Sequence, residues 1–379
     1  MQRLRFKADD GSDFPDWEKK KLEDVVEFLD GQRKPLEAGQ RVAGKYPYYG
    51  ASGIIDYVED YIFDEELILL SEDGANILDR NYRVCFLAKG KYWVNNHAHV
   101  LKAMDGNVNG FICEQLETFD YRKYNSGGAQ PKLNQATCRA IIMNMPSLPE
   151  QQKIAEFLST IDTVIEKQKE TVSAWEERKK GVMQKLFSQE VRFKADDGSD
   201  FPEWEEKKLG DIADVIMGQS PDGDSVNLND GLYLIQGKAD LLGSNIVPER
   251  LTNKPTKICE PLDLVMTVRA PVGYVVRIEF KACIGRGVCA IRAKKIDSNY
   301  LLHYMTFKES EWKKIEQGST FTAVNSDDVK TFKVSVPCLK EQQKIADCLS
   351  SFDEVIEKQK ATLAAWEELK KGLLQQMFV

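Results

Sequence analysis

Residues 148–187 read LPEQQKIAEFLSTIDTVIEKQKETVSAWEERKKGVMQKLF, and residues 339–378 repeat this stretch as LKEQQKIADCLSSFDEVIEKQKATLAAWEELKKGLLQQMF, with 26 of 40 positions identical. In both copies apolar residues recur at alternating steps of four and three, a period of 3.5 that predicts a helix with a coiled-coil seam. One helix cannot bury such a stripe alone, so we expect the two copies to pack together. The predicted helix-pair interface consists of Ile154, Leu158, Ile161, Ile165, Val172, Trp175, Ile345, Leu349, Phe352, Ile356, Leu363 and Trp366.

A second repeat lies before each helix. Residues 4–25 and 191–212 share 17 of 22 positions, so the chain runs arm, insert, helix and then arm, insert, helix again. The two inserts, 26–147 and 213–338, contain 122 and 126 residues but have little sequence in common. The sequence therefore predicts one scaffold, made twice, that carries two different modules.

The helix pair is expected to be antiparallel, related by a pseudo-two-fold axis, with the modules at opposite ends of a rod. A helix of about 38 residues is about 57 Å long at 1.5 Å per residue. In this arrangement the first arm lies near the end of the second helix, which predicts neighbouring N- and C-termini. Gln168 and Lys179, repeated as Gln359 and Lys370, interrupt the seam. Such polar residues either fix the register or sit at the edge of the seam.

Composition excludes several classes of protein. With 379 residues, 42% hydrophobic and 30% charged, the chain is long and apolar enough for two or three domains with cores of their own. It has no uncharged apolar run of about 18 residues and no signal-peptide core, so no membrane association is expected. The eight cysteines form no CxxC pair, which favours free thiols in the cytoplasm over a metal site.

Charge is unevenly distributed along the chain. The net charge of −8 at first argues against nucleic acid, but residues 51–80 hold nine acids and one base. Residues 230–300 hold eleven bases and seven acids. Only a local basic face is needed to meet phosphates, so DNA binding stays possible, with the acidic stretch turned toward solvent or a partner subunit.

The inserts read as α/β modules with short strands. Buried strands are predicted at 67–70 and 84–87 in the first insert, and at 233–235, 264–268 and 273–276 in the second, with a helix start at 301–305. Residues 46–50 are predicted to form an aromatic turn. The predicted fold class is α+β, with domains at 1–147 and 189–338 and the repeated long helices at 148–188 and 339–379.

The whole arrangement resembles the DNA-specificity subunit of type I restriction–modification systems. The segments that carry the resemblance are the helix starts 150–155 and 341–346, both reading EQQKIA, the stretch GKYPYYGASG at 44–53, NNHAH at 95–99, GGAQPKLN at 127–134 and its counterpart GSTFTAVN at 318–325. The resemblance spans essentially the whole chain, and the twofold repeat makes it specific.

The resemblance implies a division of labour. Each insert is expected to be a target-recognition domain that reads one half of a bipartite, asymmetric site in double-stranded DNA, while the helix pair sets the spacer. Two methyltransferase subunits are expected to dock and methylate adenines with S-adenosylmethionine. Restriction and translocase subunits that use ATP and Mg are expected to join them. The chain itself is expected to be non-catalytic and to bind neither cofactor nor metal. The sequence contains no phosphate loop of the GxxxxGK[ST] type.

Candidate DNA contacts in the first module fall in three segments. Lys132 and Asn134 follow a Gly-Gly pair that lets the backbone approach DNA, and Gln130 could pair with adenine. A basic–aromatic segment at 45–52 could contact a groove, although core packing of its tyrosines is the alternative. His97 and His99 share one strand face, where hydrogen bonding is favoured over metal binding because a third ligand is not apparent. The candidates are Lys45, Tyr48, Tyr49, Ser52, Asn96, His97, Gln130, Lys132 and Asn134.

In the second module the candidates lie at strand ends and between glycines. Arg269 follows a predicted strand and Arg286 lies between two glycines; arginine is the commonest specific reader of guanine, although a solvated surface charge is the alternative. The full set is Gln219, Ser220, Gln236, Lys238, Arg269, Arg286, Thr320, Thr322 and Asn325. Two other functions compete with DNA reading: a self-contained nuclease, and a coiled-coil adaptor that joins two proteins.

Overall fold

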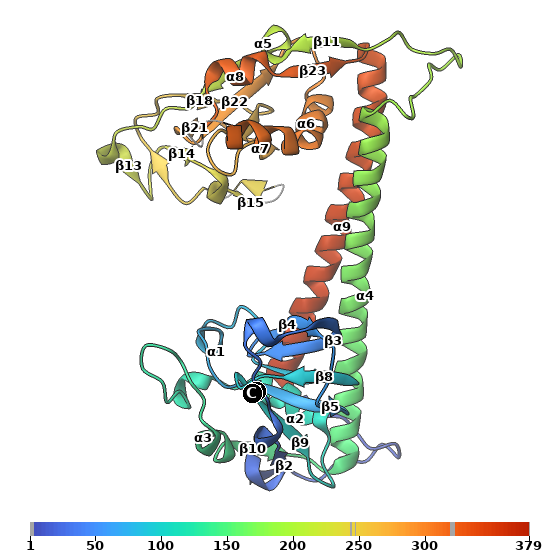
Figure 1. Ribbon diagram of the computed structural model, residues 1–379, viewed down its shortest axis with the longest axis vertical. Helices are drawn as coiled ribbons and strands as arrows, with labels where there is room; N and C mark the ends of the chain where they lie inside the picture. The colour runs from blue at the N-terminus through green and yellow to red at the C-terminus, as the bar shows by residue number, and fades with distance from the viewer. Residues whose placement is uncertain (1–3, 243–244, 247, 319–322, 379) are drawn as a thin grey trace. The chain divides into compact units, whose positions relative to one another are not determined.

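The computed structural model describes residues 4–242, 245–246, 248–318 and 323–378. Both predicted long helices are confirmed, as α4 (Leu148–Phe187) and α9 (Leu339–Phe378). Figure 1 shows the two helices side by side. The chain divides into two compact units, Met1–Glu170 with Ala361–Val379, and Thr171–Lys360. Each unit therefore contains one module together with a part of each long helix.

The two helices run antiparallel in both units. In the first unit the Nζ of Lys370 lies 2.6 Å from a carboxylate oxygen of Asp162. In the second unit the Nζ of Lys179 lies 2.5 Å from Asp353. Lys179 and Lys370 are equivalent positions of the repeat, 191 residues apart, and so are Asp162 and Asp353. The repeated lysine of one helix therefore pairs with the repeated aspartate of the other helix, and this contact is made once in each unit.

The repeated lysines are thus ion-paired seam residues. The apolar seam positions are buried or half-buried, and Trp175 and Phe352 meet edge to face with ring centroids 6.0 Å apart. Ile154 and Leu158 belong to the hydrophobic core of the first module as well. Lys370 also contacts Glu114 of α2 (Asn109–Glu117) at 3.2 Å, so this lysine ties both helices to the module.

The arms fasten to the helix starts by the same contacts in both units. The guanidinium of Arg5 donates to both carboxylate oxygens of Glu150 at 3.0 and 2.8 Å, and the indole N–H of Trp17 donates to one of them at 3.1 Å. The second arm repeats this arrangement with Arg192, Trp204 and Glu341. We call each three-residue set an arm clasp.

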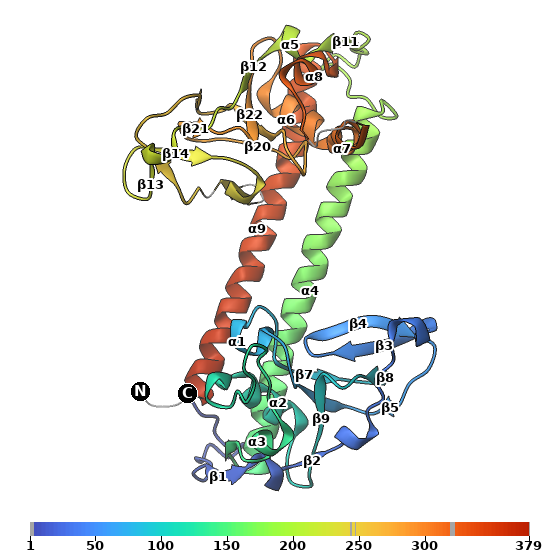
Figure 2. The same cartoon turned by 60° about the vertical axis from the view of Figure 1, so that its left-hand side comes forward.

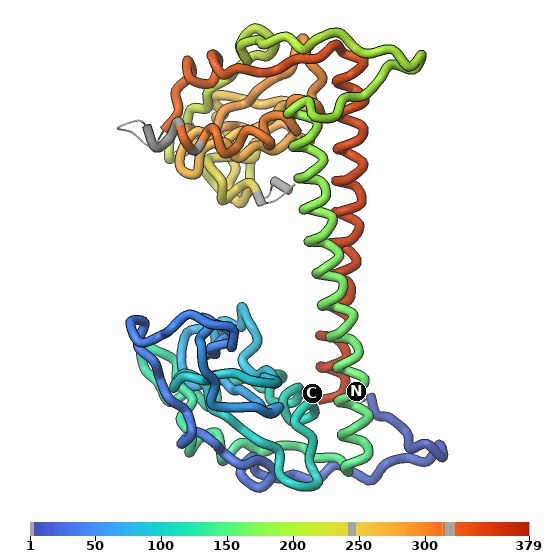
Figure 3. The backbone as a smooth tube through the Cα atoms, turned by 45° about the vertical axis from the view of Figure 1, so that its right-hand side comes forward, coloured from blue at the N-terminus to red at the C-terminus, as the bar shows by residue number. Residues whose placement is uncertain are grey.

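The prediction of neighbouring termini is confirmed. The backbone N–H of Leu4 donates to the carbonyl of Gln376 at 3.0 Å, and that of Val191 donates to Lys185 at 3.3 Å. These are equivalent contacts in the two copies, so the chain start lies against the end of α9 as the second arm lies against the end of α4. Figure 3 shows the blue start of the chain beside the red end of α9.

The first module contains two four-stranded sheets. One has the order β2-β9-β6-β7 and packs beside α2; the other has the order β4-β3-β8-β5. Their bounds are β2 Val26–Phe28, β9 Ala98–Ala103, β6 Leu67–Ser71, β7 Cys85–Ala88, β4 Gly53–Val58, β3 Ala43–Gly50, β8 Lys91–Val94 and β5 Phe63–Asp64. A separate ladder joins the arm strand β1 (Glu18–Lys21) to β10 (Ile142–Met145), and short helices lie at α1 (Asn76–Asp79) and α3 (Gln135–Arg139).

The aromatic turn predicted at 46–50 is wrong, because these residues form most of β3. Tyr48 and Tyr49 pair in parallel with β8, and the other edge of β3 pairs with β4 through two bulges. Aromatic residues favour strands. Pro47 is tolerated because it is not one of the residues that pair with β8, so its missing N–H removes no hydrogen bond from that ladder. Figure 2 shows the β3–β4 hairpin from the side.

The second module repeats this plan. The sheet β12-β22-β19-β20 corresponds to the first sheet of module 1, and β13-β17-β14-β21-β18 contains the parallel pair β14–β21 that corresponds to β3–β8. The bounds are β12 Ala213–Met217, β22 Val288–Ala293, β19 Leu264–Thr267, β20 Val275–Arg277, β13 Val226–Asn227, β17 Leu251–Thr252, β14 Leu232–Ile235, β21 Ala282–Ile284 and β18 Ile258–Cys259. Further elements are α5 Leu209–Ile212, α6 Ser298–Phe307, α7 Glu309–Gly318, α8 Ser326–Thr331, the ladder of β11 (Glu205–Lys208) with β23 (Lys333–Val336), and the pair β15 (Leu241–Leu242) and β16 (Asn245–Ile246).

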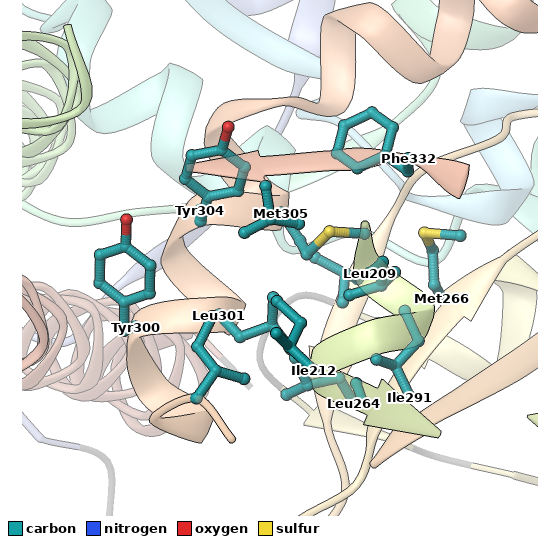
Figure 4. Close-up of a cluster of buried hydrophobic side chains, with 14 of the residues drawn as sticks. Leu209, Ile212, Leu264, Met266, Ile291, Tyr300, Leu301, Tyr304, Met305 and Phe332 are labelled. Carbon is teal, nitrogen blue, oxygen red and sulfur yellow. The ribbon is translucent and has the colours of Figure 1, made fainter. Parts of the chain in front are cut away.

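The core of the second module lies between the first sheet and α6. Leu264 and Met266 of β19 face Leu301 and Met305 of α6, as Figure 4 shows. Strands predicted at 233–235 and 264–268 are found within a residue of those bounds. The strand predicted at 273–276 begins later, at Val275, because Gly273 closes a turn by donating to Thr267 at 3.0 Å.

Two buried histidines differ in charge between the units. Burial opposes the charged form of His99, but the 2.7 Å hydrogen bond with Asp30 and the interactions with Cys138 together outweigh it and raise the pKa of His99 to about 10. Burial, and then the charge of Lys179, lower the pKa of His303 to about 4. Burial also opposes ionisation of Asp30, yet the hydrogen bond and charge of His99, the N–H of Val100 and the charge of Arg33 together hold the pKa of Asp30 below its ordinary value.

These opposite shifts predict opposite pH dependences. The stability contributed by protonated His99 is complete below about pH 6.5 and is lost as pH rises through about 10. His303 stays neutral in the fold while the unfolded chain binds a proton, so stability is lost as pH falls from about 6.5 to 4. Thermal unfolding of His99→Gln and His303→Gln against the original chain checks this. Each variant should flatten one limb of the profile, and parallel profiles would refute the assignment.

Candidate nucleic-acid interface

Several loops of the second module meet at one end of its strands. The turn between β21 and β22 lies against β14, because Gly285 donates to the carbonyl of Ile235 at 2.7 Å. The same turn accepts from the end of β19, where Val268 donates to Gly287 at 2.9 Å. The segment before α8 crosses the end of β19, with Val324 donating to Val268 at 2.9 Å. Residues far apart in the sequence therefore share one surface.

This surface is hollowed and basic. A hollow of about 370 Å³ is lined by Ser220, Gln236, Lys238, Arg269 and Arg286 among others, which brings together five of the predicted DNA contacts. A second hollow of about 580 Å³ shares Ser220, Gln236 and Arg286 and adds Arg250. None of the residues that line either hollow is acidic. We call this the module 2 face.

Glycines allow the loops of the module 2 face to approach so closely. A Cβ atom at Gly287 would lie 1.9 Å from the carbonyl oxygen of Gln236, and one at Gly218 would lie 2.1 Å from that of Gly285. No side chain fits at these distances, so both positions require glycine. Arg286 lies exposed between two buried glycines and lines both hollows.

The side chains of the module 2 face can meet DNA in two ways. The hydroxyl of Ser220 accepts from the backbone N–H and the Nε of Arg286 at 3.3 and 3.4 Å, which leaves the terminal guanidinium nitrogens to donate elsewhere. Lys238 lies 5.2 Å from the Tyr274 ring. Arginine pairs with the two acceptors of guanine, and lysine or arginine also neutralises phosphates.

The first module forms the same surface by the same backbone contacts. Asn95 donates to Tyr49 at 3.1 Å, Glu72 donates to His97 at 2.9 Å, and Leu133 donates to Glu72 at 2.7 Å. With the parallel pairs β3–β8 and β14–β21 in the same register, these bonds make positions of the two modules equivalent. Gly50 corresponds to Gln236, Ser52 to Lys238, Asp73 to Arg269, Asn96 to Arg286 and Lys132 to Ala323. We call the surface of the first module the module 1 face.

The module 1 face has a different chemistry at these equivalent positions. Asp73 carries a carboxylate where the second module has the guanidinium of Arg269, and its two oxygens lie 2.9 Å from the Nδ1 of His97. Lys132 pairs with Glu72 at 3.3 Å, and Glu72 in turn pairs with Arg33 at 2.7 Å. Equivalent backbone therefore presents one carboxylate, one lysine and neutral residues in the first module, and three cations in the second.

The structure places several predicted contacts in structural roles. Tyr48 is 1% exposed and its hydroxyl bonds to Leu36, so its side chain lies in the core and not on a DNA-facing surface. Tyr49 is half-buried against Phe86 and Tyr92. Core packing, the alternative for these tyrosines, describes both better, because residues of the same module surround each ring.

Two predicted asparagines cap helices. The side chain of Asn134 accepts from the N–H of Thr137 at 2.8 Å, and that of Asn325 accepts from Asp327 and Asp328 at 2.8 and 3.1 Å. Both residues therefore satisfy backbone donors at the starts of α3 and α8. Helix capping therefore explains why an asparagine occurs at the same position of both modules.

The remaining predicted contacts are mostly at the surface. Lys45, Ser52, Asn96, His97, Gln130, Lys132 and Gln219 are exposed, but Lys45 lies along β3 and outside the loops that form the module 1 face. Thr320 and Thr322 lie outside the described residues. His99 is buried, and its ring nitrogens form hydrogen bonds with Asp30 and with the carbonyl of Leu133. The structural role predicted for this histidine fits these contacts. Sequence reasoning missed Asp73, hidden in the acidic stretch, and Arg250, which no motif distinguishes.

The described part of the chain shows neither a metal site nor a membrane-spanning helix. Among these residues there is no group of three or more His, Cys, Asp or Glu side chains placed to hold a metal ion. The helices described include none that combines the length and the apolar character needed to cross a membrane.

Known proteins show clear similarity to this chain. A family model described as "Type I restriction modification DNA specificity domain" matches residues 15–173 and 202–365. A putative type I restriction enzyme specificity subunit of Methanocaldococcus jannaschii is 34% identical over 257 residues, covering 65% of this chain and 60% of the relative, which is less than two thirds of its length. Another, of Haemophilus influenzae, is 27% identical over 350 residues, covering 88% and 87%. The crystal structure of the type I S subunit from M. genitalium shares the fold, with a TM-score of 0.67, 14% identity and coverage of 100% and 99%.

Proposed function

The chain belongs to the family of type I restriction–modification DNA specificity subunits, and from this premise we propose that each module reads one half of a bipartite, asymmetric site in double-stranded DNA. A subunit of this kind recognises DNA and is not itself an enzyme. The observation that carries the proposal is the pair of equivalent faces. One backbone arrangement, made twice, presents different side chains at the same positions, so the two half-sites differ.

The chemistry of the module 2 face favours specific base contacts. We assign Arg269 and Arg286 to guanine, Gln236 to adenine, and Lys238 and Arg250 to phosphates, because all five line the two hollows. Ser220 holds Arg286 in position. In the first module the exposed residues of the corresponding loops, among them Ser52, Asn96, His97, Gln130 and Lys132, make the contacts. Gln219 and Lys45 are proposed as flanking contacts to the backbone.

The long helices have a separate part in this proposal. Residues 1–147 and 189–338 are assigned to recognition, and 148–188 and 339–379 to the helix pair that fixes the spacer between half-sites. Ion pairs at equivalent positions, Lys179 with Asp353 and Lys370 with Asp162, support a fixed register. A fixed register gives a fixed spacer length.

Partner subunits are proposed to supply the chemistry. The repeated arms and helices present the same surface twice, which suits two copies of one partner. We assign these places to two methyltransferase subunits that use S-adenosylmethionine, with restriction and translocase subunits that use ATP and Mg joining the complex. Because the substrate is cellular DNA and the eight cysteines are free, the complex is placed in the cytoplasm.

Replacing Arg269 tests the proposal. In a complex with the methyltransferase partner, Arg269→Ala should relax one base pair of one half-site by about 1–3 kcal/mol, because a bidentate guanine contact is lost. Mapping the methylated adenines across a genome gives both half-sites and the spacer at once. The half-site read by the first module should be unchanged.

Lys254→Ala is the matched control. Lys254 is an exposed cation of the same module that lines neither hollow, so its removal should leave the motif intact. Equal weakening on every sequence in Arg269→Ala would show that Arg269 meets only phosphate. Methylation without any bipartite motif in the original complex would defeat the proposed function itself.

A further inference from the structure

Asp73 of the module 1 face is the starting point, because it lies where the second module has Arg269. Asp73 follows Glu72, and Arg269 follows Val268. The backbone N–H of each preceding residue donates to the turn after the neighbouring strand, and its carbonyl accepts from the segment before the short helix. Both also form an isolated β-bridge with that segment, Asp73 with Lys132 and Arg269 with Ala323. The backbone is thus the same and the charge at the position is opposite.

From this we infer that the module 1 face selects a base that offers an exocyclic amino group, cytosine N4 or adenine N6, with Asp73 as the accepting residue. The inference rests on the proposed function and adds the class of base read at one position. An ionised carboxylate has only acceptor sites. Among base edges in the major groove, amino donors occur on cytosine and adenine, and a carboxylate is the side chain suited to cytosine N4.

The surroundings of Asp73 leave it suited to this task. Its neighbour Glu72 is engaged by Arg33 at 2.7 Å and by Lys132 at 3.3 Å, so that carboxylate is neutralised within the module. The side chain of Asp73 is 19% exposed and is held by His97, whose imidazole Nδ1 lies 2.9 Å from both carboxylate oxygens. Two carboxylate oxygens have about four lone-pair sites, so an imidazole contact leaves acceptor capacity.

Phosphate contact does not explain the position. A carboxylate repels the DNA backbone, so a direct contact between Asp73 and DNA is favourable only at a donor on a base. Asn96 lies at the position of Arg286 and is exposed, and its amide can both accept and donate. Two neighbouring positions of the module 1 face therefore favour bases with amino groups, whereas their counterparts favour guanine.

The test replaces Asp73 with Asn in the complex with the methyltransferase partner and maps methylation on a plasmid library of randomised half-sites. Asp73→Asn should relax discrimination by about tenfold or more at one position of the first module's half-site, where the original complex selects cytosine or adenine. The identity of that base distinguishes the two sources of the amino group. The other half-site should be unchanged, which also shows that the variant is folded.

Two further variants separate the alternatives. Glu65→Gln removes an exposed carboxylate that pairs with Lys102 at 2.6 Å and lies away from the loops, and it should leave the motif intact. If His97→Ala reproduces the full Asp73→Asn change, Asp73 acts only by holding His97 and the inference is wrong. An unchanged motif in Asp73→Asn, or guanine or thymine selected there by the original complex, also overturns it while leaving the proposed function in place.

Discussion

Replacing Glu150 with Ala is expected to destabilise the first unit by about 2–3 kcal/mol, because a buried carboxylate that accepts hydrogen bonds from a charged donor is lost. The side chain of Glu150 is 0% exposed and accepts from Arg5 at two oxygens and from Trp17. Without the carboxylate, a guanidinium and an indole N–H lose their buried acceptor. Glu341→Ala should have the same effect in the second unit, where Arg192 and Trp204 make the equivalent contacts.

Urea unfolding followed by circular dichroism measures this loss. The matched controls are Asp16→Ala and Glu203→Ala, which remove the exposed carboxylates that lie 3.7 and 3.4 Å from the same arginines. Exposed pairs of this kind contribute up to about 1 kcal/mol. If the controls lower the free energy of unfolding as much as Glu150→Ala does, the strength of the arm clasp does not come from burial of its carboxylate. Hydrogen exchange should further show the first arm, and not the second, released in Glu150→Ala.

Ile161→Asp is expected to separate the helix pair in the first unit, with a loss of at least about 4 kcal/mol. Ile161 is 5% exposed in the core that also contains Ile165 and the half-buried Trp366. An aspartate there buries a charge without a partner and adds to the negative charge of Asp162. Phe352→Asp, at the equivalent position of α9, should damage the second unit by removing the contact with Trp175.

Thr160→Asp provides the control, since Thr160 precedes Ile161 in the same helix but is exposed. Its substitution should leave the midpoint of urea unfolding nearly unchanged. The two seam variants should also abolish methylation of every sequence, in contrast to changes in the recognition faces, which alter the motif. Retention of a normal motif and spacer by the Ile161→Asp, Phe352→Asp double variant would contradict the role of the seam.

Much of the fold was predictable from local pattern and repetition. The period of 3.5 predicted both long helices, and the repeated lysines predicted interruptions of the seam. The partners Asp162 and Asp353 were not predictable, because they depend on the register of one helix against the other. The strand β3 was missed because Pro47 and two glycines suggest a turn when strand pairing is unknown.

In the candidate site, too, the sequence predicted single residues, while their arrangement was known only from the structure. Sequence reasoning found Gln236, Lys238 and Arg269 at strand ends and Arg286 between two glycines, and the structure shows that they line one hollow. It also predicted a DNA contact for Tyr48, which burial contradicts. Asp73 could have been found only by comparing the modules through their backbone hydrogen bonds, because the inserts share little sequence.

The sequence by itself determined the doubled scaffold of arms and helices, because repeats and helical periodicity are properties of neighbouring residues. Only the tertiary structure decided which positions of the unlike modules are equivalent. That equivalence comes from the parallel pairs β3–β8 and β14–β21 and the turns that follow them, which join segments far apart along the chain. Pairing between distant strands leaves no local period, so the opposed charges of Asp73 and Arg269 emerge only once the strands are in place.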